Sequence, residues 1–98
     1  MGAFLFQLEL AAFTDEMVLV IPRHRELINK LFDKGRLLSY SVSANRHMIW
    51  CVINAEEEQE AMEMVLAFPL YPYFTDVECH PLLFHNVLPL AMPGISLN

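Results

Sequence analysis

The stretch from Phe68 to Glu78 constrains the fold more than any other part of this sequence, because two prolines interrupt it. A residue before proline is pushed out of the helical region, and proline has no N–H to donate to a helix. Pro69 and Pro72 therefore predict the end of a helix, then a corner, then a strand that begins at Phe74. The residues between the prolines are largely apolar, so we expect a packed corner rather than a solvated loop.

Periodicity predicts the other elements. Apolar residues alternate in the strands and recur every three to four residues in the helices. Thr14 is the expected N-cap of the first helix and Gly35 its C-cap, and Pro22 is expected to kink or restart that helix. Asn54 is the expected N-cap of the second helix. The predicted elements are strand 4–10, helix 15–34, strand 36–44, strand 47–53, helix 55–68 and strand 74–81.

A two-residue turn at Asn45-Arg46 is expected to join the second and third strands. Such a turn fixes which residues face each other across the hairpin. The predicted pairs are Ala44 with His47, Val42 with Ile49, Tyr40 with Cys51 and Leu38 with Ile53. On the helices we expect the charged residues in solvent. They include His24, which stands between two arginines, and the acidic run Glu56, Glu57, Glu58, Glu60 and Glu63.

The element order β-α-β-β-α-β is that of the ferredoxin-like split unit, an α+β fold. It predicts one antiparallel sheet with strand order 4-1-3-2 and both helices on one face. The first strand would then separate Cys51 from Cys79 by more than the ~7 Å between Cα atoms that a disulfide tolerates. We expect a single domain over residues 1–98, with an apolar arm at 82–98.

The chain is more apolar than a small monomer needs, since 55% of its residues are hydrophobic and its mean hydropathy is +0.35. Strand parity places Trp50, Met48 and Val52 on the sheet face that the helices leave uncovered. We therefore expect two copies to pair sheet to sheet, as a homodimer or a larger oligomer that forms an α+β barrel.

Charge and composition exclude several other classes. The net charge of −6 argues against nucleic acid, which needs clustered Lys and Arg. No apolar run reaches the ~18 residues of a membrane span. The start of the chain lacks a basic n-region and a cleavage site, so we expect no signal peptide. With two cysteines only, the chain is expected in the cytoplasm.

The uncovered face is also the predicted site. A cavity between two sheets, apolar with a few polar groups, suits a small molecule, and burial there would raise the pKa of a carboxylate toward neutrality. Glu78 and Glu9 are the first candidates for the catalytic proton carrier, and His80 is the next. All three also lie near strand ends, where they could simply reach water. The expected substrate-binding residues are Gln7, Ser41, Ser43, Trp50 and Met48.

No metal or cofactor is expected. Cys79, His80 and His85 match no strong zinc spacing, and Cys51 falls on the helix-covered face. Three glycines cannot build a phosphate loop or a dinucleotide fingerprint.

The proline corner, with its Pro-Leu-Tyr-Pro-Tyr run and the later Asp76-Val77-Glu78, resembles the muconolactone isomerase family. The similarity extends back to the helix end Asp33-Lys34-Gly35. It includes the hairpin that lies between this helix end and the proline corner. The resemblance implies a ferredoxin-like fold, sheet-to-sheet assembly, no cofactor, and proton movement within an unsaturated lactone during aromatic degradation. It also implies positive charge to hold a carboxylate. Here Gln7 and Val42 stand where that family has basic residues, and Thr75 is inserted.

Two functions are therefore open. The first is a cofactor-independent isomerase that acts on a small, less charged ring compound. The second is a non-catalytic member of the α+β barrel group that binds a small ligand or only assembles.

Overall fold

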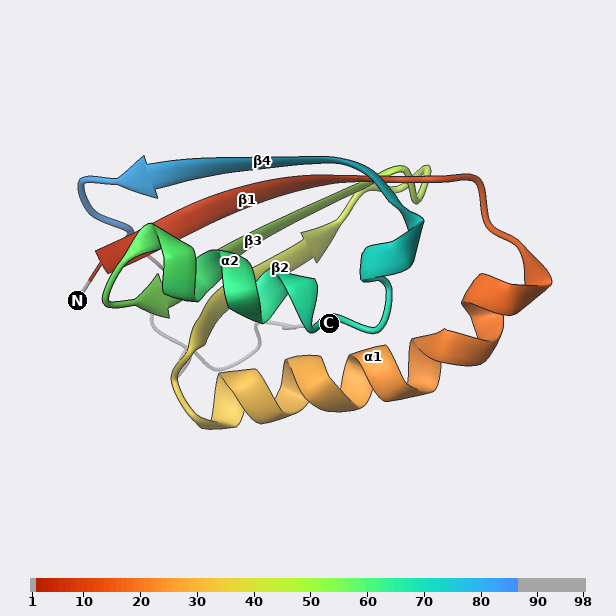
Figure 1. Cartoon of the computed structure of the whole chain (residues 1–98), viewed down its shortest axis with the longest axis horizontal. Coiled ribbons are helices and arrows are strands. Elements are labelled where there is room, and N and C mark those ends of the chain that lie inside the picture. Colours follow the sequence, from red (N-terminus) through yellow and green to blue (C-terminus); the bar gives the residue numbers. More distant parts are fainter. Residues whose placement is uncertain (1, 87–98) are drawn as a thin grey trace, which may run out of the picture.

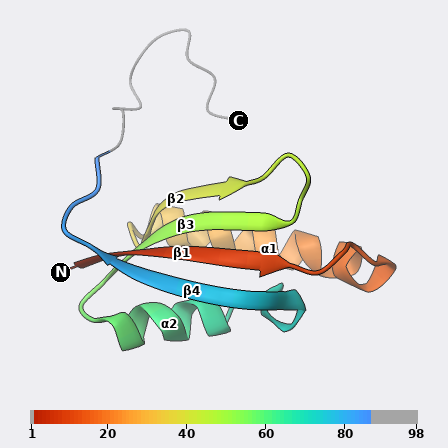
Figure 2. The same ribbon diagram turned by 90° about the horizontal axis from the view of Figure 1, so that it is seen from above.

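Four antiparallel strands form one sheet in the order β2-β3-β1-β4, and two helices cover one of its faces (Figures 1 and 2). The computed structural model describes residues 2–86. The elements are β1 Gly2–Leu10, α1 Asp15–Asp33, β2 Leu37–Val42, β3 Met48–Ala55, α2 Glu58–Leu66, the 3₁₀ turn η1 Tyr71–Tyr73 and β4 Phe74–Leu82. The predicted ferredoxin-like fold and strand order are confirmed. No helix in the described residues is long and apolar enough to cross a membrane.

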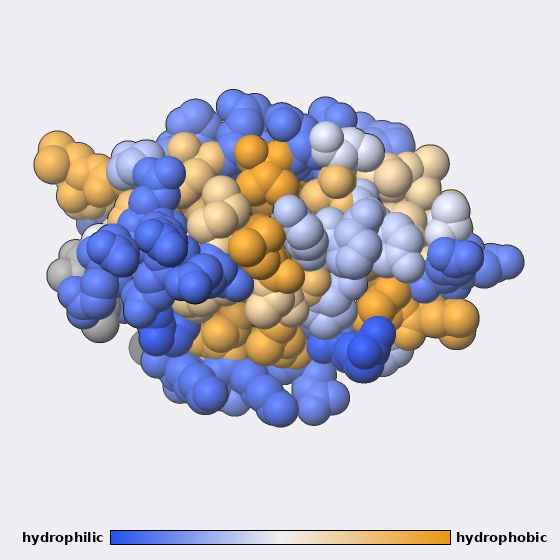
Figure 3. Space-filling view, in the orientation of Figure 1, coloured by the Kyte–Doolittle hydropathy of each residue, from blue (hydrophilic) through white to orange (hydrophobic). Residues whose placement is uncertain are grey.

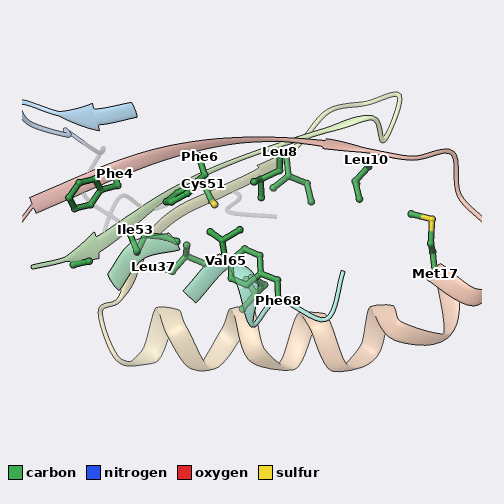
Figure 4. Packing of buried hydrophobic residues seen from close by; sticks show 14 residues of the cluster. Phe4, Phe6, Leu8, Leu10, Met17, Leu37, Cys51, Ile53, Val65 and Phe68 are labelled. Carbon is green, nitrogen blue, oxygen red and sulfur yellow. The ribbon is translucent and has the colours of Figure 1, made fainter. Parts of the chain in front are cut away.

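The core lies between the sheet and the helices. Figure 4 shows side chains of β1 and β3 packed against Val65 of α2 and against Phe68. The predicted parity holds, because Phe6 and Leu8 are fully buried while Gln7 between them is only partly so. Phe6 pairs with Cys51 on one side and with Cys79 on the other, so β1 separates the two cysteines, and both are free thiols.

The proline corner is packed as expected. Phe68 is 2% exposed and Leu70 is 4% exposed, and the corner closes through hydrogen bonds from Tyr71 N to Phe68 O (2.8 Å) and from Tyr73 N to Leu70 O (2.9 Å). After the corner, β4 has an irregularity opposite Glu9 and Leu10, at the inserted Thr75. From the α2 side, hydrophobic residues form a band bordered by hydrophilic ones, and hydrophilic residues gather over the first turns of α2 (Figure 3).

Both predicted caps of α1 are present. The Thr14 hydroxyl accepts a hydrogen bond from Met17 N (3.3 Å). At the other end Gly35 adopts φ +69°, and Gly35 N and Arg36 N donate to the last carbonyls of the helix (3.0 and 2.9 Å). This left-handed closure is one that glycine makes without strain. Pro22 lies inside one continuous helix, so the restart that it suggested does not occur.

We expect Thr14→Ala to lower the free energy of unfolding by about 1 kcal/mol, because it leaves an N–H of the first helical turn without its acceptor. Urea denaturation of the two proteins measures the difference. Thr14→Ser, which keeps the hydroxyl, is the control and should remain close to the wild type. Equal losses in both variants would assign the effect to the methyl group rather than to the cap.

The hairpin differs from the prediction at both ends. Val42–Ile49 and Tyr40–Cys51 pair as expected, but Ile53 pairs with Leu37 and not with Leu38. A bulge after Leu37 shifts the register, which buries Leu37 (2% exposed) and turns Leu38 outward (36%). The strands also end sooner, and a loop from Ser43 to His47 replaces the predicted two-residue turn. Its positive φ at Arg46 (65°) is stabilised by the Asn45 side chain, which accepts from Ser43 Oγ (2.7 Å) and His47 N (3.0 Å).

The second helix begins later than predicted. Asn54 is not its N-cap, because β3 continues to Ala55 in register with β1. The Asn54 amide instead donates to Gly35 O (3.2 Å). The helix starts at Glu58, and Glu60 supplies the local contacts, accepting from Glu56 N (2.8 Å) and lying 3.0 Å from Arg36 Nη2. Apart from Glu60, which is half-buried, the acidic run is exposed as expected.

Candidate functional site

Four of the predicted site residues form one row across the uncovered face. Ser41, Trp50, Gln7 and Glu78 lie opposite one another on β2, β3, β1 and β4. Trp50 Nε1 donates to Gln7 Oε1 (3.3 Å), and Gln7 Nε2 donates to Glu78 Oε2 (3.3 Å). The amide of Gln7 therefore ties the indole to the carboxylate. Strand parity predicted that these residues share a face, and the pairing register of β1 with β3 and β4 aligns them.

The remaining predicted residues surround this row. His80 Nε2 lies 3.8 Å from Glu78 Oε1, and Glu9 Oε1 accepts from Thr75 Oγ1 (2.8 Å). Met48 lies beside Glu9, and the Ser43 hydroxyl accepts from Met48 N (3.0 Å). The hydroxyl of Ser43 is thus used to hold the turn. In the single chain Glu78, Glu9 and His80 are exposed.

A hollow lies on the opposite side of the sheet, between α1 and the strands. This helix-side pocket has a volume of about 520 Å³. Its floor is made of buried residues and its rim of exposed or partly exposed ones. The lining residues are Leu10, Phe13, Ile21, His24, Arg25, Ile28, Asn29, Phe32, Tyr40, Val42, Ile49 and Leu70.

His24 lines the pocket and corrects a prediction. It was expected in solvent, but it is 3% exposed. Its Nε2 lies 2.8 Å from Tyr40 Oη, and its ring contacts Phe68 edge-on (5.4 Å between centroids, 87° between planes). Its Nδ1 is buried and has no hydrogen-bond partner in the described residues. The signal was present in the sequence, because the inward positions Met17, Ile21 and Ile28 leave room for one more inward residue at position 24.

Burial sets the charge of this pair. It lowers the pKa of His24 to about 4, so the imidazole is neutral at pH 7. Burial also raises the pKa of Tyr40, so its hydroxyl keeps its proton. A neutral imidazole has one nitrogen that donates and one that accepts. The wall of the pocket therefore contains a fixed, uncharged pair of polar groups.

The buried imidazole makes stability depend on pH. The unfolded chain, whose His24 has the ordinary pKa of 6.5, takes up a proton before the folded chain does. The free energy of unfolding is therefore greatest above pH 6.5 and falls as the pH drops from there toward about 4. At ~1.4 kcal/mol per pKa unit, the loss due to His24 reaches about 3 kcal/mol.

Denaturation at about pH 7 and about pH 5 measures about 2 kcal/mol of this loss, because the loss grows by ~1.4 kcal/mol for each pH unit below the unfolded pKa of 6.5. His24→Gln should remove that part of the pH dependence, and His47→Gln, at an exposed position of the hairpin loop, should retain it. If the stability of all three proteins depended on pH in the same way, His24 would take up its proton in the folded chain at the same pH as in the unfolded chain, and burial would have no effect on it.

The lining of the helix-side pocket has no acidic side chain, although the protein as a whole carries a net negative charge. Arg25 lies on the rim, and the Arg46 guanidinium lies 5.8 Å from the ring centre of Phe13, another rim residue. The described residues contain no group of three or more potential metal ligands.

Comparisons with known proteins identify the fold. No protein-family model matches the chain, and no curated protein matches its sequence. Among solved structures, a 5-chloro-2-hydroxyhydroquinone dehydrochlorinase of Burkholderia phenoliruptrix, in complex with 2,5-dihydroxybenzoquinone, matches with a TM-score of 0.59 at 12% identity, over 80% of this chain and 90% of that chain. An antibiotic biosynthesis monooxygenase matches with a TM-score of 0.54 at 13% identity, over 91% of this chain and 100% of that chain. At these identities the likeness shows the ferredoxin-like fold.

Proposed function

We propose that this protein binds a small unsaturated ring compound in the helix-side pocket and moves a proton within it without a cofactor. The observation that carries the proposal is the buried Nδ1 of His24, which has no partner among the described residues and belongs to a pocket-lining ring. Buried polar atoms normally have a partner, so one without a partner in a pocket wall calls for an explanation, and a functional role for the imidazole is one.

The dimensions and chemistry of the pocket support this proposal. A volume of about 520 Å³ is within the range of small-molecule sites. The floor residues Leu10, Ile49 and Leu70 are buried and apolar, and would keep water from a bound ring. A neutral imidazole can accept a proton, and Arg25 on the rim offers a charge to an anionic substituent.

Two further considerations favour ring compounds that rearrange by proton transfer. The resemblance of the proline corner to muconolactone isomerases suggests an isomerase that acts on a lactone-like ring. A protein of the same fold, the dehydrochlorinase described above, was solved with a quinone, which is also a small unsaturated ring. Neither consideration names the substrate, since one fold serves many reactions.

The uncovered sheet face supports a second candidate site. If two copies pair through this face, the row Ser41-Trp50-Gln7-Glu78 would be enclosed, with Glu78 or Glu9 as the proton carrier and His80 as the next choice. The hydrogen bonds within that row favour it, because they fix the Glu78 carboxylate in place. The homodimer and the cytoplasmic location remain part of the proposal.

Proton exchange in D₂O tests the function directly. Unsaturated lactones and cyclic enones are incubated with the protein, and deuterium uptake at ring carbons is followed by NMR. We expect catalysed uptake into at least one of these ring classes. Binding without uptake would support the non-catalytic alternative, in which the pocket only holds a ligand. If no compound of the panel were bound and none took up deuterium, the proposal would be contradicted.

A further inference from the structure

The two border strands of the sheet differ in charge. β2 and β4 each have one edge that pairs with no described element (Figure 2). β4 carries Asp76, Glu78 and Pro81, which are residue types that keep an exposed strand edge from pairing. β2 has no charged residue and no proline from Leu37 to Val42. The edge of β2 is therefore open to another strand.

The backbone of β2 offers hydrogen-bonding groups at this edge. Ser43 N donates to Met48 O (2.9 Å), so the backbone N–H of Ser43 points toward β3. In an antiparallel pair, successive residues alternate between facing the neighbouring strand and facing away from it. The N–H and C=O groups of Val42 and Tyr40 consequently point to the free edge. A strand placed beside β2 would supply their partners, which is the geometry of β-strand addition.

The helix-side pocket opens beside the same edge. Its inner lining includes Leu10 and Ile49, at the end of β1 and on β3, and both are buried. Its outer lining includes Val42 on β2 (49% exposed) and Phe32 on α1 (42% exposed). Since exposure rises toward β2 and α1, the mouth of the pocket lies between these two elements. Alternate side chains of an added strand would point toward this mouth, where an apolar one would cover Val42 and Phe32.

The surroundings of β2 are positive in a protein whose net charge is negative. Residues 23–46 run from the middle of α1 through β2 to the hairpin loop. They contain all six Lys and Arg of the chain and two of its twelve acidic residues, so their net charge is +4 and that of the other residues is −10. Arg25 on the pocket rim and Arg46 in the loop form no ion pair in the part of the chain that the structure describes. This charge favours an acidic partner and disfavours the β2 of a second copy.

We propose that the free edge of β2 binds an extended acidic peptide segment of a partner protein as an additional antiparallel strand, with apolar side chains of that segment over the mouth of the helix-side pocket. The inference goes beyond the proposed function and does not depend on it, because the edge and the arginines would bind the segment whatever the pocket does. The acidic β4 of another copy is the less favoured occupant. Its pairing with β2 would be head to tail, which extends from copy to copy instead of closing a dimer.

The probe is a synthetic octapeptide in which valine alternates with glutamate, blocked at both ends and fluorescently labelled. We expect saturable binding in fluorescence anisotropy and slowed hydrogen exchange of the Tyr40 and Val42 amides in NMR. Two control peptides separate the contributions. One has N-methylated valines, which cannot donate to β2, and the other has lysine in place of glutamate. Both should bind about 10-fold more weakly or worse.

Variants of the protein test the edge itself. Val42→Pro removes one edge N–H, which a border strand tolerates, and should bind the probe about 3- to 10-fold more weakly than Val42→Ala, which keeps it. Arg25→Gln combined with Arg46→Gln should reduce the salt dependence of binding, whereas Lys30→Gln, at an exposed lysine outside the pocket lining, should not. No binding of the probe, equal affinity for all three peptides, or protection confined to β4 would overturn the inference. Tyr40 and Val42 amides that are already protected in the free protein would also overturn it, because a second copy would then hold the edge.

Discussion

Replacing His24 by glutamine is expected to slow deuterium exchange on a ring substrate by about 10²–10⁴-fold, which is the usual loss when a general base is removed. Glutamine is a conservative choice because its terminal amide can take the place of Nε2 and keep a hydrogen bond to Tyr40. It cannot replace Nδ1, which has no partner in the described residues. The variant therefore removes the proposed base with the least disturbance to packing against Phe68.

Two control variants make this result specific. His47→Gln changes the same residue type in the exposed loop and should leave the exchange rate unchanged. Glu78→Gln tests the candidate site on the uncovered face. Loss of exchange in Glu78→Gln with a normal rate in His24→Gln would move the reaction to the uncovered face. A thermal melt of each variant separates lost chemistry from lost folding.

The predictable part of this fold follows from side-chain alternation. Phe6 and Leu8 face the helices and Gln7 faces away, and the same period in the other strands places Trp50 and Glu78 beside Gln7. Period-two patterns reveal faces because every residue of a strand takes part in them. The residues that share the uncovered face could therefore be predicted from the sequence, whereas the register that aligns Gln7 with Trp50 and Glu78 could not.

The helix-side pocket could not be predicted in this way. Alternation assigns Leu10 and Ile49 to the helix-covered face, but it does not reveal whether α1 packs tightly against them. Tight packing depends on the distance between helix and sheet, which the sequence pattern does not encode. The one available sign was His24, an inward position on an otherwise apolar stripe, and its two arginine neighbours obscured it.

The two strand irregularities show a related limit. One extra residue in β2 moves Leu37 into the core and Leu38 out of it, and an irregularity at Thr75 interrupts the pairing of β4 with β1. A bulge changes the register without changing the composition of a strand. Only the pairing partner reveals it.

Replacing Trp50 by glutamate is expected to convert a homodimer into monomers. Several hydrophobic residues of the uncovered face reach the surface of the single chain, among them Trp50 (38% exposed) and Leu38 (36%). Val52 is already buried in the single chain (3% exposed), but the indole of Trp50 is not, and we propose that a second copy covers it. The indole lies in the middle of the face, on β3 and next to β1, where interface residues contribute most.

Loss of such a central tryptophan costs about 2–4 kcal/mol, and a glutamate left in the interface adds the cost of a buried, unpaired charge. The dimer should weaken by about 10³-fold or more, which light scattering at micromolar concentration detects as a halved mass. Leu19→Glu is the matched control, since Leu19 is 80% exposed on α1, away from the sheet face. A wild-type protein that is already monomeric would refute the proposed assembly. A Trp50→Glu variant that remains dimeric would place the interface elsewhere, because no sheet-to-sheet contact could enclose this row without burying the new charge.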